Sequence, residues 1–221
     1  VAHDLKNPIS QIKGLVDIIQ MENEKMSEQQ LKFLGMIGGT SDRLNNMIHR
    51  LLDARAVEKA EIKLHLQEVD LADMMEEVRI DFSMRAAEKR IQLVYEQPDF
   101  QHLVNVDPDY TRQILDNILS NALKFSPFDK NIYLVLKRKG DQIYAGIQDE
   151  GPGITPEDMK KLFGKFQKLS ARPTNGESSS GLGLSIVKRF AEEMGGTVWA
   201  ESDPGQGATF WVRFPAVEVL A

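Results

Sequence analysis

Apolar residues in the first quarter of the chain recur in steps of three and four, the spacing of a helix packed along one seam. A polar stretch, residues 22–27, separates two such series. The pattern predicts two long helices over residues 3–58, joined as an antiparallel hairpin. The first seam is Ala2, Leu5, Ile9, Ile12, Val16 and Ile19; the second, mostly apolar, is Phe33, Ile37, Thr40, Leu44, Met47, Leu51 and Ala54.

Further apolar side chains lie beside these seams, and two helices alone have too little surface to cover them. Packing two copies of the hairpin into a four-helix bundle would bury them. We therefore expect the chain to form a homodimer. The additional apolar residues are Leu15, Ile18, Leu34, Ile48 and Leu52.

The pattern changes at about residue 61 to short alternating strands mixed with amphipathic helices. This grouping predicts an α+β fold in which a helical hairpin, residues 1–60, precedes an α/β sandwich, residues 61–221, with helices on one face of a mixed sheet. Asp70 is the expected N-cap of one helix. Strands are expected at 62–66, 91–96, 103–106, 132–138, 143–149, 197–202 and 208–214, and helices at 71–89, 108–125, 157–163 and 182–194.

The amino-acid composition argues against several classes of protein. The 221 residues carry a net charge of −6 and a pI near 5.3, which argues against a nucleic-acid binder because phosphate contacts need clustered Lys and Arg. Cysteine is absent, so there is no disulfide framework, in keeping with a cytoplasmic location. No apolar run reaches the roughly 20 residues that span a bilayer. Since the chain opens inside an expected helix, we expect a piece of a longer protein, and an upstream membrane anchor stays open.

Three polar residues lie together at the start of the first helix: His3, Asp4 and Asn7. His3 and Asn7 are four residues apart and share one helix face, off the seam. An exposed neutral imidazole is a usable nucleophile toward phosphorus, and Asp4 is placed to fix its tautomer and accept its proton. Asn7 is suited to orient a water for hydrolysis of a phosphohistidine. The alternative is an ordinary surface histidine beside a first-turn acid.

A second polar cluster lies in the expected helix 108–125. Asn117, Asn121 and Lys124 are spaced four and three and form one stripe. A carboxamide oxygen is a suitable ligand for Mg²⁺, and a lysine beside it suits phosphate oxygens. A plain solvated helix face is the alternative explanation.

Two glycine-containing segments follow. Asp149 ends a strand before Gly151 and Gly153, and a fixed carboxylate there favours adenine, whose exocyclic amine is a donor. The glycines allow close approach of the backbone, although such a run is often only a turn. The segment Gly181-Leu182-Gly183 opens a helix whose free N–H groups favour phosphate. Residues 170–180 before it are expected to form a mobile lid over ATP.

These motifs, taken in order, resemble a known family. The run His3-Asp4-Leu5-Lys6-Asn7-Pro8 resembles the H-box of sensor histidine kinases of two-component systems. The later segments, from the expected helix 108–125 to Gly181-Leu182-Gly183, resemble the N, G1, F and G2 boxes of the ATPase superfamily that histidine kinases share with Hsp90, DNA gyrase and MutL. The resemblance covers the chain from His3 to about Phe214.

The resemblance implies a protein histidine kinase with a Bergerat-type ATP site. His3 would be autophosphorylated with help from Asp4, Asn7 would serve a phosphatase activity, and the phosphoryl group would pass to an aspartate of a response-regulator receiver domain. Mg²⁺ would be held by Asn121. Around ATP the resemblance places Asn117, Lys124, Asp149, Gly151, Gly153, Gly181, Leu182, Gly183 and Phe125, the last where many relatives carry tyrosine.

Two other function classes stay open from the residues alone. One is an ATP-driven clamp of the Hsp90 or MutL kind, against which the H-box and the helical hairpin argue. The other is a degenerate kinase that acts as a scaffold without turnover, which the intact candidate residues disfavour.

Overall fold

The computed structural model describes residues 62–100, 102–167, 169–174 and 181–217, together with residues 12, 16, 19, 27, 30 and 33–38. The chain divides into two compact units, Val1–Glu61 and Ile62–Ala221.

The N-terminal unit is helical at the described seam positions. Ile12, Val16 and Ile19 are helical, and so are residues 33–38. Val16 is only 5% exposed, and a Cβ atom on Gly38 would lie 3.7 Å from its Cγ1, so Val16 and Gly38 are adjacent. The remaining seam positions lie outside the described residues, and dimerisation stays a prediction. Several described apolar side chains are exposed on the single chain: Ile12, Ile19, Phe33, Met36 and Ile37.

The C-terminal unit is built on a five-stranded sheet in the order β2-β4-β5-β7-β6. β2 runs parallel to β4, and the other neighbours are antiparallel. A separate antiparallel pair joins β1 to β3. The strands are β1 Gln67–Asp70, β2 Gln92–Tyr95, β3 Leu103–Val106, β4 Asn131–Lys139, β5 Gln142–Asp149, β6 Thr197–Ser202 and β7 Ala208–Pro215.

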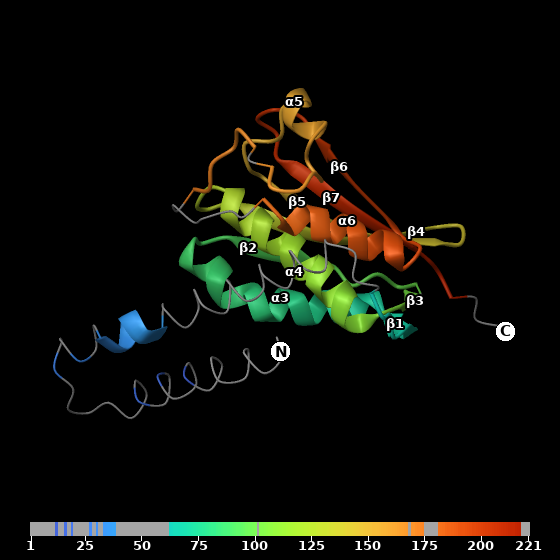
Figure 1. The fold of residues 1–221 in the computed structure, drawn as a ribbon, viewed down its shortest axis with the longest axis horizontal. Coiled ribbons are helices and arrows are strands. Elements are labelled where there is room, and N and C mark those ends of the chain that lie inside the picture. Colours follow the sequence, from blue (N-terminus) through green and yellow to red (C-terminus); the bar gives the residue numbers. More distant parts are fainter. Residues whose placement is uncertain are drawn as a thin grey trace. The chain divides into compact units, whose positions relative to one another are not determined.

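Three long helices form a layer against one face of this sheet (Figure 1). Buried and less buried residues alternate along β4, as expected where one face meets the helices. The predicted α+β sandwich is therefore confirmed. None of the described helices is both long and apolar enough to cross a bilayer. The helices are α3 Leu71–Glu88, α4 Pro108–Phe125, α5 Pro156–Met159 and α6 Gly183–Glu193.

The strand expected at 62–66 is wrong. Residues 62–66 have no regular structure, and the strand begins at Gln67, which pairs with Val106. The partner strand sets this limit, because β3 ends at Val106 and the next residue, Asp107, caps α4. The Asp107 carboxylate also accepts the backbone N–H of His65 at 2.8 Å. This bond takes the place of a backbone hydrogen bond to a partner strand.

Helices α3 and α4 both begin at an aspartate N-cap. Asp70 accepts the N–H of Ala72 at 2.8 Å, which confirms the predicted N-cap of α3. Asp107 accepts the N–H groups of Asp109 and Tyr110 at the start of α4. The caps fix where α4 starts, and with it the direction in which its polar stripe faces.

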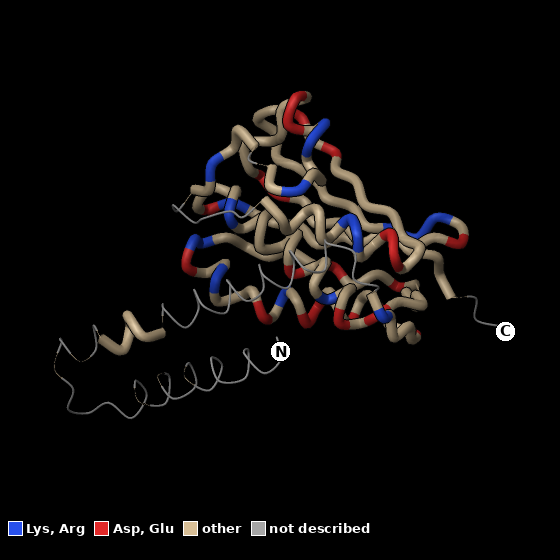
Figure 2. Tube along the Cα trace, in the orientation of Figure 1, with Lys and Arg blue, Asp and Glu red and all other residues tan. Residues whose placement is uncertain are grey.

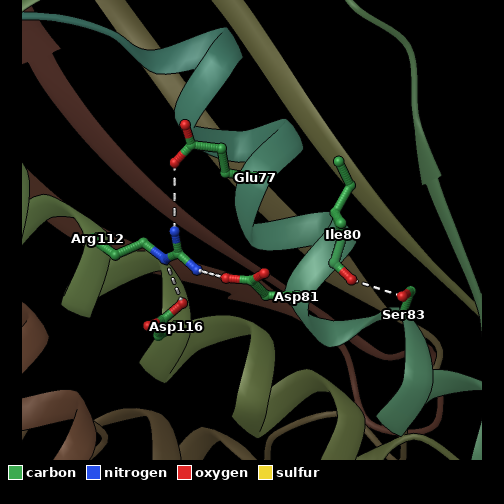
Figure 3. Close-up of polar contacts among 6 residues, drawn as sticks. All are labelled: Glu77, Ile80, Asp81, Ser83, Arg112 and Asp116. Carbon is green, nitrogen blue, oxygen red and sulfur yellow. Dashed lines mark hydrogen bonds and ion pairs between the residues drawn. The ribbon is translucent and has the colours of Figure 1, made fainter.

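Arg112 ties α4 to α3 through carboxylates on both helices (Figure 3). Its guanidinium lies 3.0 Å from Asp116, one turn further along α4, and 3.5 Å from Glu77 of α3, and it also pairs with Asp81 of α3. Acidic positions recur along α3 (Figure 2). Burial raises the pKa of Asp116, although the Arg112 guanidinium opposes the rise. The cation therefore offsets several negative charges at once.

We predict that Arg112→Met destabilises the fold, because it leaves three carboxylates together without their shared cation. The free energy of unfolding should fall by about 1–2 kcal/mol, measured by urea unfolding at pH 7 and low salt. Arg112→Lys should recover only part of this loss, since lysine lacks the planar fork that contacts several carboxylates. Unchanged stability of the Met variant would show that the cluster contributes nothing.

Candidate functional site

The polar stripe of α4 faces a cavity. The opposite side of the helix is buried in the core through Ile114, Leu115, Ile118, Leu119 and Leu123. Asn117, Asn121 and Lys124 all line a cavity of about 570 Å³. The helix therefore places two carboxamide residues and a lysine along the wall of one cavity, on the shared face that their spacing predicted.

Two further segments complete this large cavity. One is the start of α6, through Gly181 and Gly183, and the other is the stretch before the undescribed residues 175–180. Six of the residues that line the large cavity were predicted from the sequence to surround ATP: Asn117, Asn121, Lys124, Phe125, Gly181 and Gly183. The lining residues outside that set are Ser120, Leu162, Gln167, Leu169, Ala171, Arg172, Pro173 and Leu184.

A small apolar cavity of about 50 Å³ shares walls with the large one, including Asn121, Phe125 and Leu184. Asp149 and Gly153 also line it. Most of its other lining side chains are hydrocarbon: Ile154, Leu162, Leu169, Ala171, Ala208 and Phe210. A flat apolar group with a polar edge would suit this slot, since Asp149 provides a carboxylate in its wall.

Asp149 is only 5% exposed. Its Oδ1 accepts the backbone N–H of Gly151 at 2.8 Å and that of Ala208 at 3.2 Å. Burial raises the pKa of Asp149 to about 6, and the two backbone N–H groups oppose the rise. Among the described residues no donor reaches Oδ2, so this oxygen remains to accept a hydrogen bond from a ligand.

Two glycines let the loop after β5 contact the turn between β6 and β7. Gly153 has φ +71°, and a Cβ there would overlap the carbonyl oxygen of Asp203. Gly207 has φ +76°, and a Cβ there would overlap the carbonyl oxygen of Asp149. The close packing brings the N–H of Ala208 onto the Asp149 carboxylate. Sequence reasoning missed this contribution of Gly207 and Ala208, because nothing local in residues 205–210 points to a strand sixty residues earlier.

The start of α6 meets α4 at a glycine. A Cβ on Gly183 would lie 2.9 Å from Oδ1 of Asn117, so glycine leaves room for that carboxamide. The Asn117 Nδ2 donates to the carbonyl of Gln113 at 2.8 Å. Leu182 is 3% exposed, and neither Leu182 nor Gly151 lines the two cavities. Gly151 acts through its N–H on Asp149 instead.

The structure describes the predicted metal ligand but not the predicted phosphotransfer residues. His3, Asp4 and Asn7 lie outside the described residues. Asn121, the proposed metal ligand, lines both cavities. The described residues contain no cluster of three His, Asp or Glu side chains that could coordinate a metal ion by themselves. A single carboxamide oxygen fits Mg²⁺ only where phosphates and water supply the other ligands, which is how this ion is commonly held.

Two known families match the chain. The family described as "Histidine kinase-, DNA gyrase B-, and HSP90-like ATPase" matches residues 106–218, just over half of the chain. The family described as "His Kinase A (phospho-acceptor) domain" matches residues 1–58.

Curated relatives and solved structures agree with these families. The sensor histidine kinase WalK of Bacillus subtilis is 26% identical over 220 residues, covering 99% of this chain and 36% of WalK. The sensor protein SrrB of Staphylococcus aureus is 27% identical, covering 99% of this chain and 37% of SrrB. The crystal structure of full-length ShkA in complex with AMPPNP has a TM-score of 0.77 and 28% identity, covering 100% of this chain and 45% of that one.

The chain thus spans a little over a third of the length of the curated relatives it matches. Its phospho-acceptor match, residues 1–58, precedes its ATPase match, residues 106–218, in the chain. The chain belongs to the histidine kinase-, DNA gyrase B- and HSP90-like ATPase family, and it resembles the catalytic core of a sensor histidine kinase over its whole length.

Proposed function

We propose that this chain transfers the γ-phosphoryl group of ATP to His3 and then to an aspartate of a response-regulator receiver domain. The observation that carries the proposal is the pair of adjoining cavities, one apolar with a buried carboxylate and one polar with two carboxamides and an ammonium. A nucleotide has the same two parts, a flat base and a charged phosphate chain.

In this proposal the base enters the small cavity. Asp149 accepts a hydrogen bond from the exocyclic amine of adenine through Oδ2, while Oδ1 stays bonded to Gly151 and Ala208. Guanine presents an acceptor at that position, so it would meet the carboxylate with repulsion. The hydrocarbon walls contact the two ring faces.

The phosphates extend into the large cavity in this proposal. Asn121 supplies a carboxamide oxygen to Mg²⁺, with Asn117 nearby and Lys124 on a phosphate oxygen. Mg²⁺ bound there would neutralise negative charge that develops on the transferring phosphate oxygens. The start of α6 at Gly181 and Gly183 offers backbone N–H groups to the phosphates.

The phosphoryl acceptor in this proposal is the unprotonated ring nitrogen of His3. It forms a bond to the γ-phosphorus as the bond from that phosphorus to the bridging oxygen breaks, and ADP leaves with the electron pair. Asp4 takes the proton from the other ring nitrogen. Asn7 orients a water molecule that hydrolyses the phosphohistidine and releases inorganic phosphate. The match of residues 1–58 to a phospho-acceptor domain supports this assignment.

We further propose a domain division, a cellular location and an oligomeric state for this chain. Residues 1–60 form the dimerisation and phosphotransfer domain and residues 61–221 bind ATP, with the core placed in the cytoplasm. Exposed apolar side chains on the single N-terminal unit, among them Phe33 at 53% and Met36 at 58%, support a homodimer. A receiver domain would then dock on the helical bundle.

An ATP-driven clamp is the second candidate, because the same ATPase family includes gyrase- and HSP90-like members. Incubation with γ-labelled ATP separates the candidates. A clamp hydrolyses ATP without labelling itself, a scaffold does neither, and a histidine kinase acquires an acid-labile, base-stable label.

We predict that His3→Gln abolishes this label, because the substituted side chain has no nucleophilic ring nitrogen. Binding of ATP should stay within about twofold of the unaltered chain, since His3 is not among the proposed nucleotide contacts. His65→Gln is the matched control and should label normally: the described contact of His65 is made by its backbone N–H. Retention of the label in His3→Gln would place the phosphohistidine elsewhere.

We predict that Asn121→Ala lowers the labelling rate by about 10²-fold or more, because it removes a preorganised oxygen ligand at the transferring phosphate. Ser120→Ala, a neighbouring cavity residue, should label at close to the normal rate. Circular dichroism and the thermal midpoint should be unchanged for both. Normal labelling of Asn121→Ala would remove Asn121 from the mechanism.

We predict that adenosine affinity falls below pH 6, by about tenfold per pH unit, as Asp149 takes up a proton and ceases to be a charged acceptor. Adenosine isolates this effect because it has no phosphates to titrate. The folding stability of the ligand-free protein should change with pH in the opposite direction. Because the pKa of Asp149 is raised, its carboxyl group binds a proton more tightly in the folded state than in the unfolded state. Its contribution to stability therefore grows as pH falls through about 6.

Asp149→Asn is the control for both effects. The variant should bind adenosine weakly and without pH dependence between pH 5 and 7, measured by calorimetry, while its thermal midpoint at pH 7 is no lower. A steep pH dependence that survives in Asp149→Asn would assign the titration to another group.

A further inference from the structure

Lys89, directly after the last residue of α3, is only 5% exposed. Lysine is rarely buried to this extent, because an ammonium loses its hydration at a cost of several kcal/mol unless hydrogen bonds replace it. Two of its acceptors are main-chain carbonyls at the end of α4: Leu123 O at 2.5 Å and Ser126 O at 2.8 Å from Nζ. The cation thereby complements the negative end of the helix that carries the candidate site.

The third acceptor belongs to a different part of the chain. Nζ of Lys89 also lies 2.5 Å from Oγ1 of Thr174, 85 residues later. Thr174 is bound to α4 as well, since its N–H donates to Lys124 O at 3.0 Å and its hydroxyl lies 2.9 Å from Ser126 O. A cation on α3 therefore fastens this loop residue to the end of α4.

The residues just before Thr174 form a wall of the large cavity. Ala171, Arg172 and Pro173 all line it. At the other end of this wall, Asp158 accepts the N–H of Ser170 at 2.8 Å and its hydroxyl at 2.5 Å. These hydrogen bonds, with a contact from Lys161, lower the pKa of Asp158 to about 2, so it stays a charged acceptor. The wall is thus tied down at both ends by groups outside it.

We propose that Lys89 and Thr174 are positioning residues of the nucleotide site, which hold the wall 171–173 at the distance from α4 that ATP requires. The inference rests on the proposed function, because it concerns the same cavity. Neither side chain lines the cavity, so both act through the wall. Arranging a wall before the ligand arrives lowers the ordering needed on binding.

The alternative is that Lys89 only caps α4. The Thr174 hydroxyl separates the two possibilities, because the cap on Leu123 O and Ser126 O is present without it. A matched control lies in the same cluster: Ser126 Oγ is fully buried, and among the described residues it has no hydrogen-bond partner. Removing that hydroxyl perturbs the cluster but not the link to Thr174.

The test compares Thr174→Val, Thr174→Ser and Ser126→Ala in the full chain, with a fluorescent ATP analogue and the rate of His3 labelling. We expect Thr174→Val to raise the dissociation constant and the KM for ATP by about tenfold, the loss of one hydrogen bond to a charged group. The labelling rate at saturating ATP should stay within about twofold of normal, as for a lost binding interaction. Thr174→Ser and Ser126→Ala should both bind and label normally.

Each outcome decides one point. Normal nucleotide affinity in Thr174→Val would overturn the inference while leaving the proposed function intact. An equal loss of affinity in Ser126→Ala would also overturn it, by showing that any disturbance of the cluster has the effect. Failure of the unaltered chain to bind the analogue would instead overturn the proposed function. A Thr174→Val chain that does not fold is replaced by Thr174→Ala, to which the same expectations apply.

Discussion

A charged carboxylate held in a hydrocarbon slot is the constraint around which the C-terminal unit is arranged. Burial of Asp149 favours its protonated form, and among the described residues the backbone N–H groups of Gly151 and Ala208 oppose this. Both donors depend on chain geometry: one on the loop after β5, the other on the antiparallel pairing of β5 with β7. A hydrogen-bond donor from a bound base would complete this set, as we propose for adenine.

Helix α4 connects this carboxylate to the rest of the site. Its start is capped by Asp107 and joined to α3 by Arg112, and its end is held by Lys89. The stripe of cavity-lining residues Asn117, Asn121 and Lys124 lies between these fixed points. Side chains on a helix held at both ends keep their mutual distances, which is what a reaction limited by positioning and charge neutralisation needs.

Local patterns predicted much of this site, and long-range contacts account for what they missed. The spacing of Asn117, Asn121 and Lys124 and the Asp70 cap are properties of a few neighbouring residues, so they could be predicted from sequence. The bonds from Lys89 to Thr174 and from Ala208 to Asp149 join residues 85 and 59 positions apart, and no local signal marks them. The strand expected at 62–66 failed for the same reason, because its real limit is set by where β3 ends.

The proposed nucleotide site and the proposed phosphoryl acceptor belong to different units of the chain, and this separates what each would contribute to function. A cavity that holds adenine and phosphates would serve a kinase and a clamp equally well, so in our proposal Asp149 and Asn121 determine whether ATP is used at all. His3 would determine where the phosphoryl group goes. Substitutions around the cavity should therefore reduce every ATP-dependent activity together, whereas substitutions near His3 should redirect or abolish transfer while ATP is still bound.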